Sequence, residues 1–132
     1  MKNDDIYILI RYRLEQAKTA LEDAKYLLEG KRSSQSIINR AYYAMFYATL
    51  ALLQKVGKIP SKHAGVISLF DREFVLNNIF PRELSKDFHR AFELRHLSDY
   101  KTYEPISLEK SEEILIKAGK FVDAVEKYLN VK

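Results

Sequence analysis

Arg95 is the residue in this sequence that points most directly to chemistry. Phe88 and Phe92 lie on the apolar stripe of a predicted helix, and Arg95 continues that stripe at the same helical spacing. A charged group in such a position needs a carboxylate, a phosphate or a partner subunit beside it, because an unpaired buried charge is costly. Arg95 is therefore the first candidate site residue.

The neighbours of Arg95 are compatible with two interpretations. In the structural one, Arg95 forms an ion pair with Asp99, which lies four residues later on the same helix face. In the functional one, Arg95 points into a cleft at the end of a helical bundle, or across a two-fold axis, and binds a phosphate through two hydrogen bonds. His96, Asp99 and Tyr100 would then surround the phosphate.

A second polar cluster occurs where Asn39 and Arg40 precede two adjacent tyrosines. Asn39 and Tyr43 are one helical turn apart, and the asparagine interrupts an otherwise apolar helix. Tyrosines at this spacing usually belong to a core or an interface, although they can also stack on bases. We take Asn39, Arg40, Tyr43, His63 and His96 as candidates for binding a nucleotide or RNA. For His63, a helix cap or a buried structural role is the alternative.

Several kinds of site are excluded by what the sequence lacks. It contains no cysteine, so it has no disulfide, thiolate nucleophile or cysteine-bound metal, and its three histidines are scattered. It also has no phosphate-cradling glycine-rich loop, no HExxH and no GxSxG motif. We therefore expect neither a metal site nor a cofactor.

The positive charge is concentrated in the middle of the chain. Residues 31–102 contain 12 basic and 6 acidic side chains, a net charge of +6, whereas residues 1–30 and residues 103–132 each carry a net charge of −1. A basic section can bind a phosphate-bearing partner, although such charges often only solvate a surface. No apolar run reaches the roughly 20 residues of a membrane span, so we expect a cytoplasmic protein without membrane contact.

The elements that must position these residues are helices. Apolar residues recur at steps of three and four from Ile10 to Leu28, and Gly30 is the expected stop signal. Ser33 or Ser34 can cap a second helix that reaches about Val56, and its centre is apolar on all sides, as in a central helix. Further helices are predicted from Pro60 to about Asn77, from Pro81 through Arg95, and from Ser107 to the C-terminus.

These patterns predict one all-α domain over residues 1–132. Its 132 residues are enough for one continuous core, and close to half of them are apolar. No segment shows the alternation of a half-buried strand. We expect an up-down antiparallel bundle of four long helices with a shorter extra one.

Three stretches of this sequence resemble the HEPN superfamily of prokaryotic helical proteins. The segment Ser36–Ala48, with Asn39-Arg40-Ala41-Tyr42-Tyr43 inside it, looks like the signature helix of that superfamily. The segment Ser61–Phe70 extends the likeness. The ending Arg95-x-x-x-Asp99-Tyr100 resembles one uncharacterised branch.

The resemblance implies a dimer that acts with a small nucleotidyltransferase, often as a toxin–antitoxin pair. In catalytic members, an Arg followed four to six residues later by His forms a metal-independent ribonuclease site at the dimer interface, and the arginine corresponds to Arg95. This chain departs from the pattern, because the expected histidine positions hold Tyr100, Lys101 and Thr102. RNA cleavage would then depend on Arg95 to stabilise charge, Asp99 as base and Tyr100 as acid.

The main functional hypothesis is a dimeric HEPN protein that binds a nucleotide or RNA around Arg95 and acts with a nucleotidyltransferase. One alternative is a metal-independent ribonuclease with an altered site. A second is a helical adaptor without catalysis, in which Arg95 and Asp99 only satisfy each other. A related hypothesis has Tyr100 or Tyr103 receive a nucleotidyl group from the partner enzyme.

Overall fold

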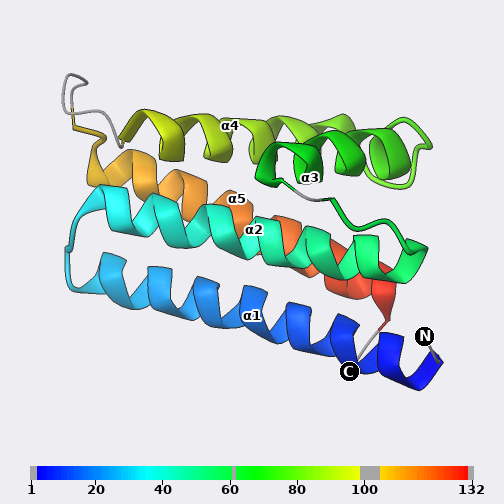
Figure 1. Cartoon of the computed structure of the whole chain (residues 1–132). Helices are drawn as coiled ribbons and strands as arrows, with labels where there is room; N and C mark the ends of the chain where they lie inside the picture. Colours follow the sequence, from blue (N-terminus) through cyan, green and yellow to red (C-terminus); the bar gives the residue numbers. More distant parts are fainter. Residues whose placement is uncertain (1–2, 61, 99–104, 131–132) are drawn as a thin grey trace.

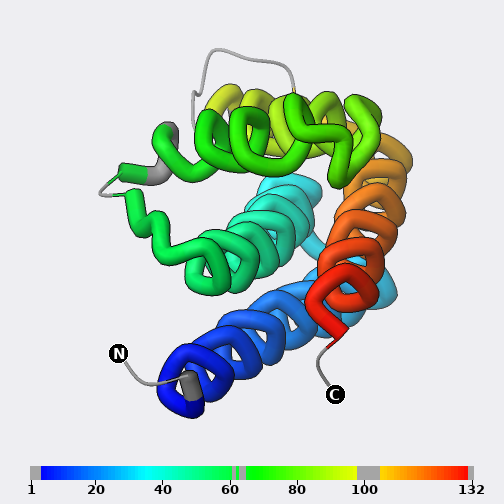
Figure 2. Tube along the Cα trace, turned by 90° about the vertical axis from the view of Figure 1, so that its right-hand side faces the viewer, coloured from blue at the N-terminus to red at the C-terminus, as the bar shows by residue number. Residues whose placement is uncertain are grey.

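The computed structural model describes residues 3–60, 62–98 and 105–130, without the side chains of residues 3, 63, 64 and 98. This part of the chain contains α1 (Asn3–Glu29), α2 (Ser34–Val56), α3 (His63–Phe70), α4 (Arg82–Ser98) and α5 (Leu108–Leu129), and no strand. α2 lies between α1 on one side and α3 and α4 on the other, with α5 packed along it (Figures 1 and 2). The predicted bundle of four long helices and one shorter helix is confirmed.

The central helix of the bundle is α2. It contacts each of the other four α-helices, and Ala41, Tyr42, Ala44 and Met45 in its middle are completely buried. A helix without a polar face keeps its apolar surface away from water only where neighbouring helices cover it on several sides. The apolar composition of this segment therefore determined its place in the fold. None of the described helices is long and apolar enough to cross a bilayer.

Local signals explain where most of the helices begin and end. The Ser33 hydroxyl accepts a hydrogen bond from the Ser36 amide at 3.1 Å, and the Ser107 hydroxyl accepts one from the Lys110 amide at 3.0 Å. Gly57 ends α2 in a left-handed conformation, with φ of 72°. α1 also ends as expected, at Glu29, but the left-handed residue is Lys31 rather than Gly30.

The segment after α3 differs from the predicted uninterrupted helix. It continues as a turn of π-helix over Asp71–Val75, in which the Leu76 amide donates to the Asp71 carbonyl at 2.9 Å. Two side chains of α4 contact the Asp71 carboxylate: the Ser85 hydroxyl at 2.6 Å and His89 Nε2 at 2.7 Å. These contacts come from a distant segment, so helical periodicity could not reveal them.

An aromatic cluster joins this turn to the rest of the core. The ring of Phe70 packs against four other phenylalanine rings, with centroid distances between 5.1 and 6.1 Å, and contacts between 4.5 and 7 Å are favourable for aromatic pairs. The four are Phe74, Phe80, Phe88 and Phe121. The cluster fixes α4 relative to α3 and α5, and so helps to place the end of α4 that carries Arg95.

Candidate functional site

Arg95 lies in the last turn of α4 and faces α2. Its guanidinium carbon is 5.1 Å from the ring centroid of Tyr42 and 5.3 Å from that of Tyr43, and Arg95 Nη2 is 3.4 Å from the Tyr43 hydroxyl oxygen. A separation of 3.4 Å is long for a hydrogen bond, so the two cation–π contacts are the stronger interaction. The predicted inward direction of Arg95 thus brings it onto two aromatic rings.

Arg40 approaches the same tyrosine from within α2. Its guanidinium carbon is 5.2 Å from the Tyr43 ring centroid, and its Nε and Nη2 donate to Asn39 Oδ1 at 3.2 and 3.1 Å. This explains the polar residue in an apolar helix, because the Asn39 amide orients Arg40. The structure therefore brings together four of the predicted site residues, Asn39, Arg40, Tyr43 and Arg95.

Tyr42 forms the buried floor of this group. The residue is completely buried, and its ring packs against Tyr43, Phe46, Phe88 and Phe92. Among the residues that the structure describes, none forms a hydrogen bond with its hydroxyl. Burial raises the pKa of Tyr42 to about 12, although the nearby Arg95 guanidinium opposes this effect. Tyr42 is therefore neutral near pH 7 and serves as a surface for Arg95 rather than as an acid or base.

The structure does not bring the other predicted site residues into this arginine–tyrosine group. The imidazole of His96 is exposed and stacks on Phe92, with a centroid distance of 6.2 Å and an interplanar angle of 10°. His63 is the first residue of α3, and its side chain is outside the described part. Asp99 and Tyr100 also lie outside the described residues. The roles assigned to them remain predictions.

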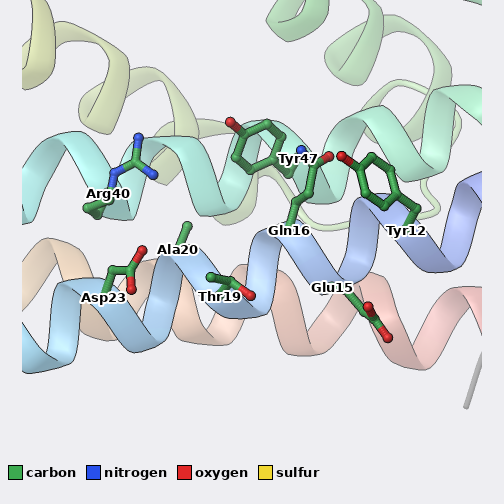
Figure 3. Close-up of a pocket in the computed structure, with 8 residues that line it drawn as sticks. All are labelled: Tyr12, Glu15, Gln16, Thr19, Ala20, Asp23, Arg40 and Tyr47. Carbon is green, nitrogen blue, oxygen red and sulfur yellow. The ribbon is translucent and has the colours of Figure 1, made fainter.

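A surface groove between α1 and α2 borders the site and was not expected from the sequence. It has a volume of about 320 Å³, and Tyr47 and Arg40 of α2 face residues of α1 across it (Figure 3). The residues from α1 are Tyr12, Glu15, Gln16, Thr19, Ala20 and Asp23. A second groove, of about 340 Å³, lies at the other side of Arg40 and includes Asn39 and Gln35. Arg40 therefore lines both grooves and also contacts Tyr43.

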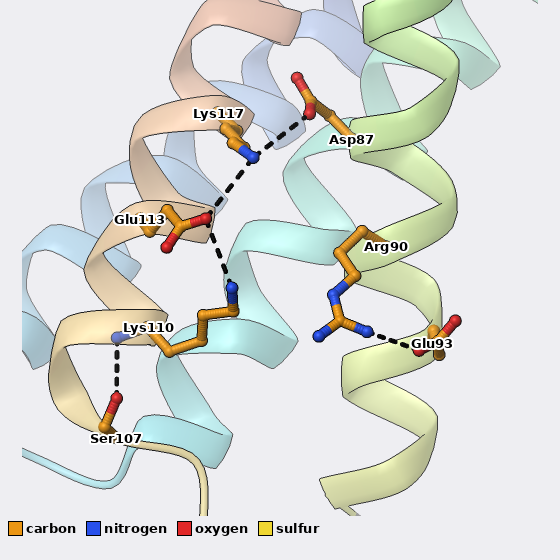
Figure 4. Close-up of polar contacts among 7 residues, drawn as sticks. All are labelled: Asp87, Arg90, Glu93, Ser107, Lys110, Glu113 and Lys117. Carbon is orange, nitrogen blue, oxygen red and sulfur yellow. Dashed lines mark hydrogen bonds and ion pairs between the residues drawn. The ribbon is translucent and has the colours of Figure 1, made fainter.

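A polar network between α4 and α5 lies apart from the arginine–tyrosine group. Lys117 Nζ is 3.7 Å from Asp87 Oδ1 and 3.5 Å from Glu113 Oε1, and Lys110 Nζ is 3.4 Å from the same oxygen of Glu113 (Figure 4). Asp87 is only 8% exposed, and burial raises the pKa of its carboxyl despite the opposing charge of Lys117. This network connects two helices, so we assign it to stability. The described residues contain no group of three side chains that could hold a metal ion.

Sequence comparison finds relatives that match most of this chain. The chain is 40% identical to a "UPF0332 protein" of Thermotoga maritima over 121 residues, which is 92% of this chain and 91% of the relative. It is 36% identical to "Putative toxin MJ0605" of Methanocaldococcus jannaschii over 127 residues, which is 96% of this chain and 93% of the relative. "Putative toxin MJ0142" of the same organism is 33% identical over 116 residues, which is 88% of this chain and 78% of that relative.

A family model describes nearly the same extent of the chain. The model of the HEPN domain matches residues 10–128, a range that includes α2 with Arg40, Tyr42 and Tyr43, and α4 with Arg95. The resemblance inferred from the residues of these two helices is therefore confirmed, and the chain belongs to the HEPN domain family.

Proposed function

We propose that this chain is a toxin-like HEPN protein that binds RNA or a nucleotide at Arg95. The main support for this proposal is that the Arg95 guanidinium contacts the rings of Tyr42 and Tyr43. Aromatic rings contact the face of a guanidinium, and that geometry suits hydrogen bonding from its N–H edge to a phosphate. The toxin assignment is supported by the names of two relatives from Methanocaldococcus jannaschii.

The chemistry at this site is binding, with cleavage as an additional hypothesis. In a metal-independent cleavage by the RNA 2′-hydroxyl, Asp99 would accept the hydroxyl proton and Tyr100 would protonate the leaving 5′-oxygen, while Arg95 would stabilise the negative charge on the non-bridging phosphate oxygens. Tyr42 is not a candidate for either role, because a pKa of about 12 keeps its phenol protonated and makes it a weak acid. Asp99 and Tyr100 therefore carry the proposed acid–base chemistry.

The proposed function includes self-association. Tyr43, Tyr47 and Leu50 are half-buried on one face of α2, at steps of four and three residues. A stripe with this spacing on an otherwise buried helix suits packing against another helix. We propose that a second copy packs along this stripe and leaves the grooves beside Arg40 open at the edge of the interface, and that a small nucleotidyltransferase is the partner protein. Light scattering should give twice the chain mass of 15.5 kDa, and a monomer would contradict the dimer.

The decisive experiment compares Arg95→Ala with Arg90→Ala. Both arginines lie on α4, but Arg90 forms an exposed ion pair with Glu93, at 2.5 Å (Figure 4). We expect Arg95→Ala to lose at least tenfold in affinity for single-stranded RNA, and Arg90→Ala to lose less than threefold, because one charge-assisted contact is worth about 1.5 to 3 kcal/mol. Equal affinities in all three proteins would refute the site.

The same proteins test for cleavage. RNA is incubated with each protein in excess EDTA, and the products are separated by size. Cleavage by the native chain and not by Arg95→Ala would establish a metal-independent ribonuclease. Equal cleavage by the native chain and Arg95→Ala would indicate a contaminating nuclease and leave RNA or nucleotide binding as the activity. If neither binding nor cleavage occurs, the adaptor hypothesis is favoured.

A further inference from the structure

We infer that Arg40 and Arg95, which both contact the Tyr43 ring, act together as a clamp for two phosphate groups. This inference rests on the proposed function and extends it, because it adds a second cation and specifies a ligand with two phosphates. Such a pair of phosphates occurs as successive phosphates of single-stranded RNA and as the diphosphate of a nucleotide. In both cases the shared chemistry is two closely spaced phosphates.

The geometry of Tyr43 brings the two cations together. The guanidinium carbon of Arg40 is 5.2 Å from the Tyr43 ring centroid, and that of Arg95 is 5.3 Å from it. The two guanidinium groups are thus no farther apart than these two distances added together. They come from different helices, α2 and α4, so the fold and not the local sequence creates the pair.

Arg40 is oriented by a neutral group. Asn39 Oδ1 accepts hydrogen bonds from its Nε and Nη2, and among the described residues no carboxylate forms an ion pair with Arg40. A guanidinium has five N–H donors in a planar fork, so two bonds to Asn39 leave donors for a phosphate. The amide fixes the direction of the fork without cancelling its charge.

A ligand can reach Arg40 from the surface. Arg40 lines the groove of about 320 Å³ between α1 and α2 and also the groove of about 340 Å³ beside Asn39. Two positive charges near one ring repel each other, and an anion that contacts both offsets this repulsion through charge-assisted hydrogen bonds. A ligand with two phosphates can contact both cations, whereas a ligand with a single phosphate contacts one of them.

The test measures how salt weakens the binding of a fluorescein-labelled 12-nucleotide oligoadenylate. For single strands, each neutralised phosphate contributes about 0.7 to the slope of log K against log salt. We expect Arg40→Gln and Arg95→Gln each to reduce the slope by about 0.7, and the double variant to reduce it by about 1.4. Arg40→Lys retains a charge and should change the slope by less than about 0.3.

Arg13 provides a matched control. Its Nη1 donates to Gln16 Oε1 at 2.9 Å, and its guanidinium carbon is 5.8 Å from the Tyr12 ring centroid, so its amide and ring contacts resemble those of Arg40. Arg13→Gln should leave the slope unchanged. Thermal unfolding of every variant shows whether it is folded, and if Arg40→Gln is not, Arg40→Ala takes its place.

Competition with small ligands distinguishes the two sources of phosphate. AMP, ADP and the dinucleotide pApA compete with the labelled RNA for the native protein and for Arg40→Gln. If pApA competes better than both AMP and ADP for the native protein but not for Arg40→Gln, the clamp binds successive phosphates of RNA. If ADP competes better than AMP for the native protein but not for that variant, the clamp binds the diphosphate of a nucleotide.

The inference can fail separately from the proposed function. If Arg95→Gln lowers the slope and Arg40→Gln matches Arg13→Gln, the clamp is refuted and RNA binding at Arg95 stands. If the native protein binds neither the RNA nor the three small ligands, both proposals are refuted.

Discussion

Arg95 Nη2 and the Tyr43 hydroxyl oxygen are 3.4 Å apart, and this contact joins the end of α4 to the first half of α2. The Arg95 guanidinium also lies 5.3 Å from the Tyr43 ring centroid, so two different interactions connect the same pair of residues. Their relative contributions can be separated by substitution, because Phe retains the ring and removes only the hydroxyl.

We expect Tyr43→Phe to change the free energy of unfolding by less than about 0.5 kcal/mol, since a 3.4 Å hydrogen bond is weak. Tyr43→Leu removes the ring contacts with both Arg40 and Arg95 and should cost about 1 to 2 kcal/mol. Urea unfolding of the two variants measures the difference. Equal losses would show that the hydroxyl, and not the ring, stabilises the contact.

Asp87 should make stability depend on pH. Burial raises the pKa of its carboxyl above the ordinary value, so the folded state holds a proton more tightly than the unfolded state does. The stabilising contribution is present below the unfolded pKa and is lost as pH rises through the folded pKa. Asp87→Asn should therefore gain stability relative to the native chain as pH rises from 3 to 7.

Urea unfolding at a series of pH values measures this difference for Asp87→Asn. Asp123→Asn is a suitable control, because Asp123 is an exposed carboxylate of α5 that pairs with Lys127 at 3.1 Å. A relative stability of Asp87→Asn that falls with increasing pH would mean that Lys117, and not burial, dominates the environment of Asp87.

Replacing two glycines by alanine should change the free energy of unfolding in opposite directions. Gly57 has a φ of 72°, which alanine rarely adopts, so Gly57→Ala should destabilise by about 1 kcal/mol. Gly119 lies inside α5, where alanine should stabilise by about 0.5 to 1 kcal/mol. A Cβ at either position would meet no atom within 4 Å, so sterics do not interfere. Thermal or urea unfolding of both variants tests the contrast.

Ser107 should contribute to stability as the cap of α5. Its hydroxyl accepts a hydrogen bond from the Lys110 amide at 3.0 Å, and replacing such a cap by alanine costs about 1 kcal/mol (Figure 4). Ser107→Asp keeps an acceptor at this position and should stay within about 0.5 kcal/mol of the native chain. A similar loss in both variants would show that the hydroxyl itself is required, for reasons other than capping.

The helices themselves could be predicted because their signals are local. Ser33, Gly57 and Ser107 act on residues a few positions away, and their roles as caps are confirmed. The end of α1 shows the limit of such signals, since Lys31 and not Gly30 adopts the left-handed conformation. Helical periodicity does not predict the π-helical turn at Asp71–Val75, where the Asp71 carboxylate contacts Ser85 and His89 of α4.

The sequence by itself determined the helical class, the central place of α2, the inward direction of Arg95 and the likeness to the HEPN family. These follow from periodicity, capping and motif spacing, which act within one helix. Only the tertiary structure decided that Tyr42 is buried, whereas the ring of its neighbour Tyr43 contacts both Arg40 and Arg95. It also decided that Arg40 lines the grooves beside α1. Such choices depend on the packing of α1, α2 and α4, whose residues are far apart in the sequence, and no local pattern encodes their distances.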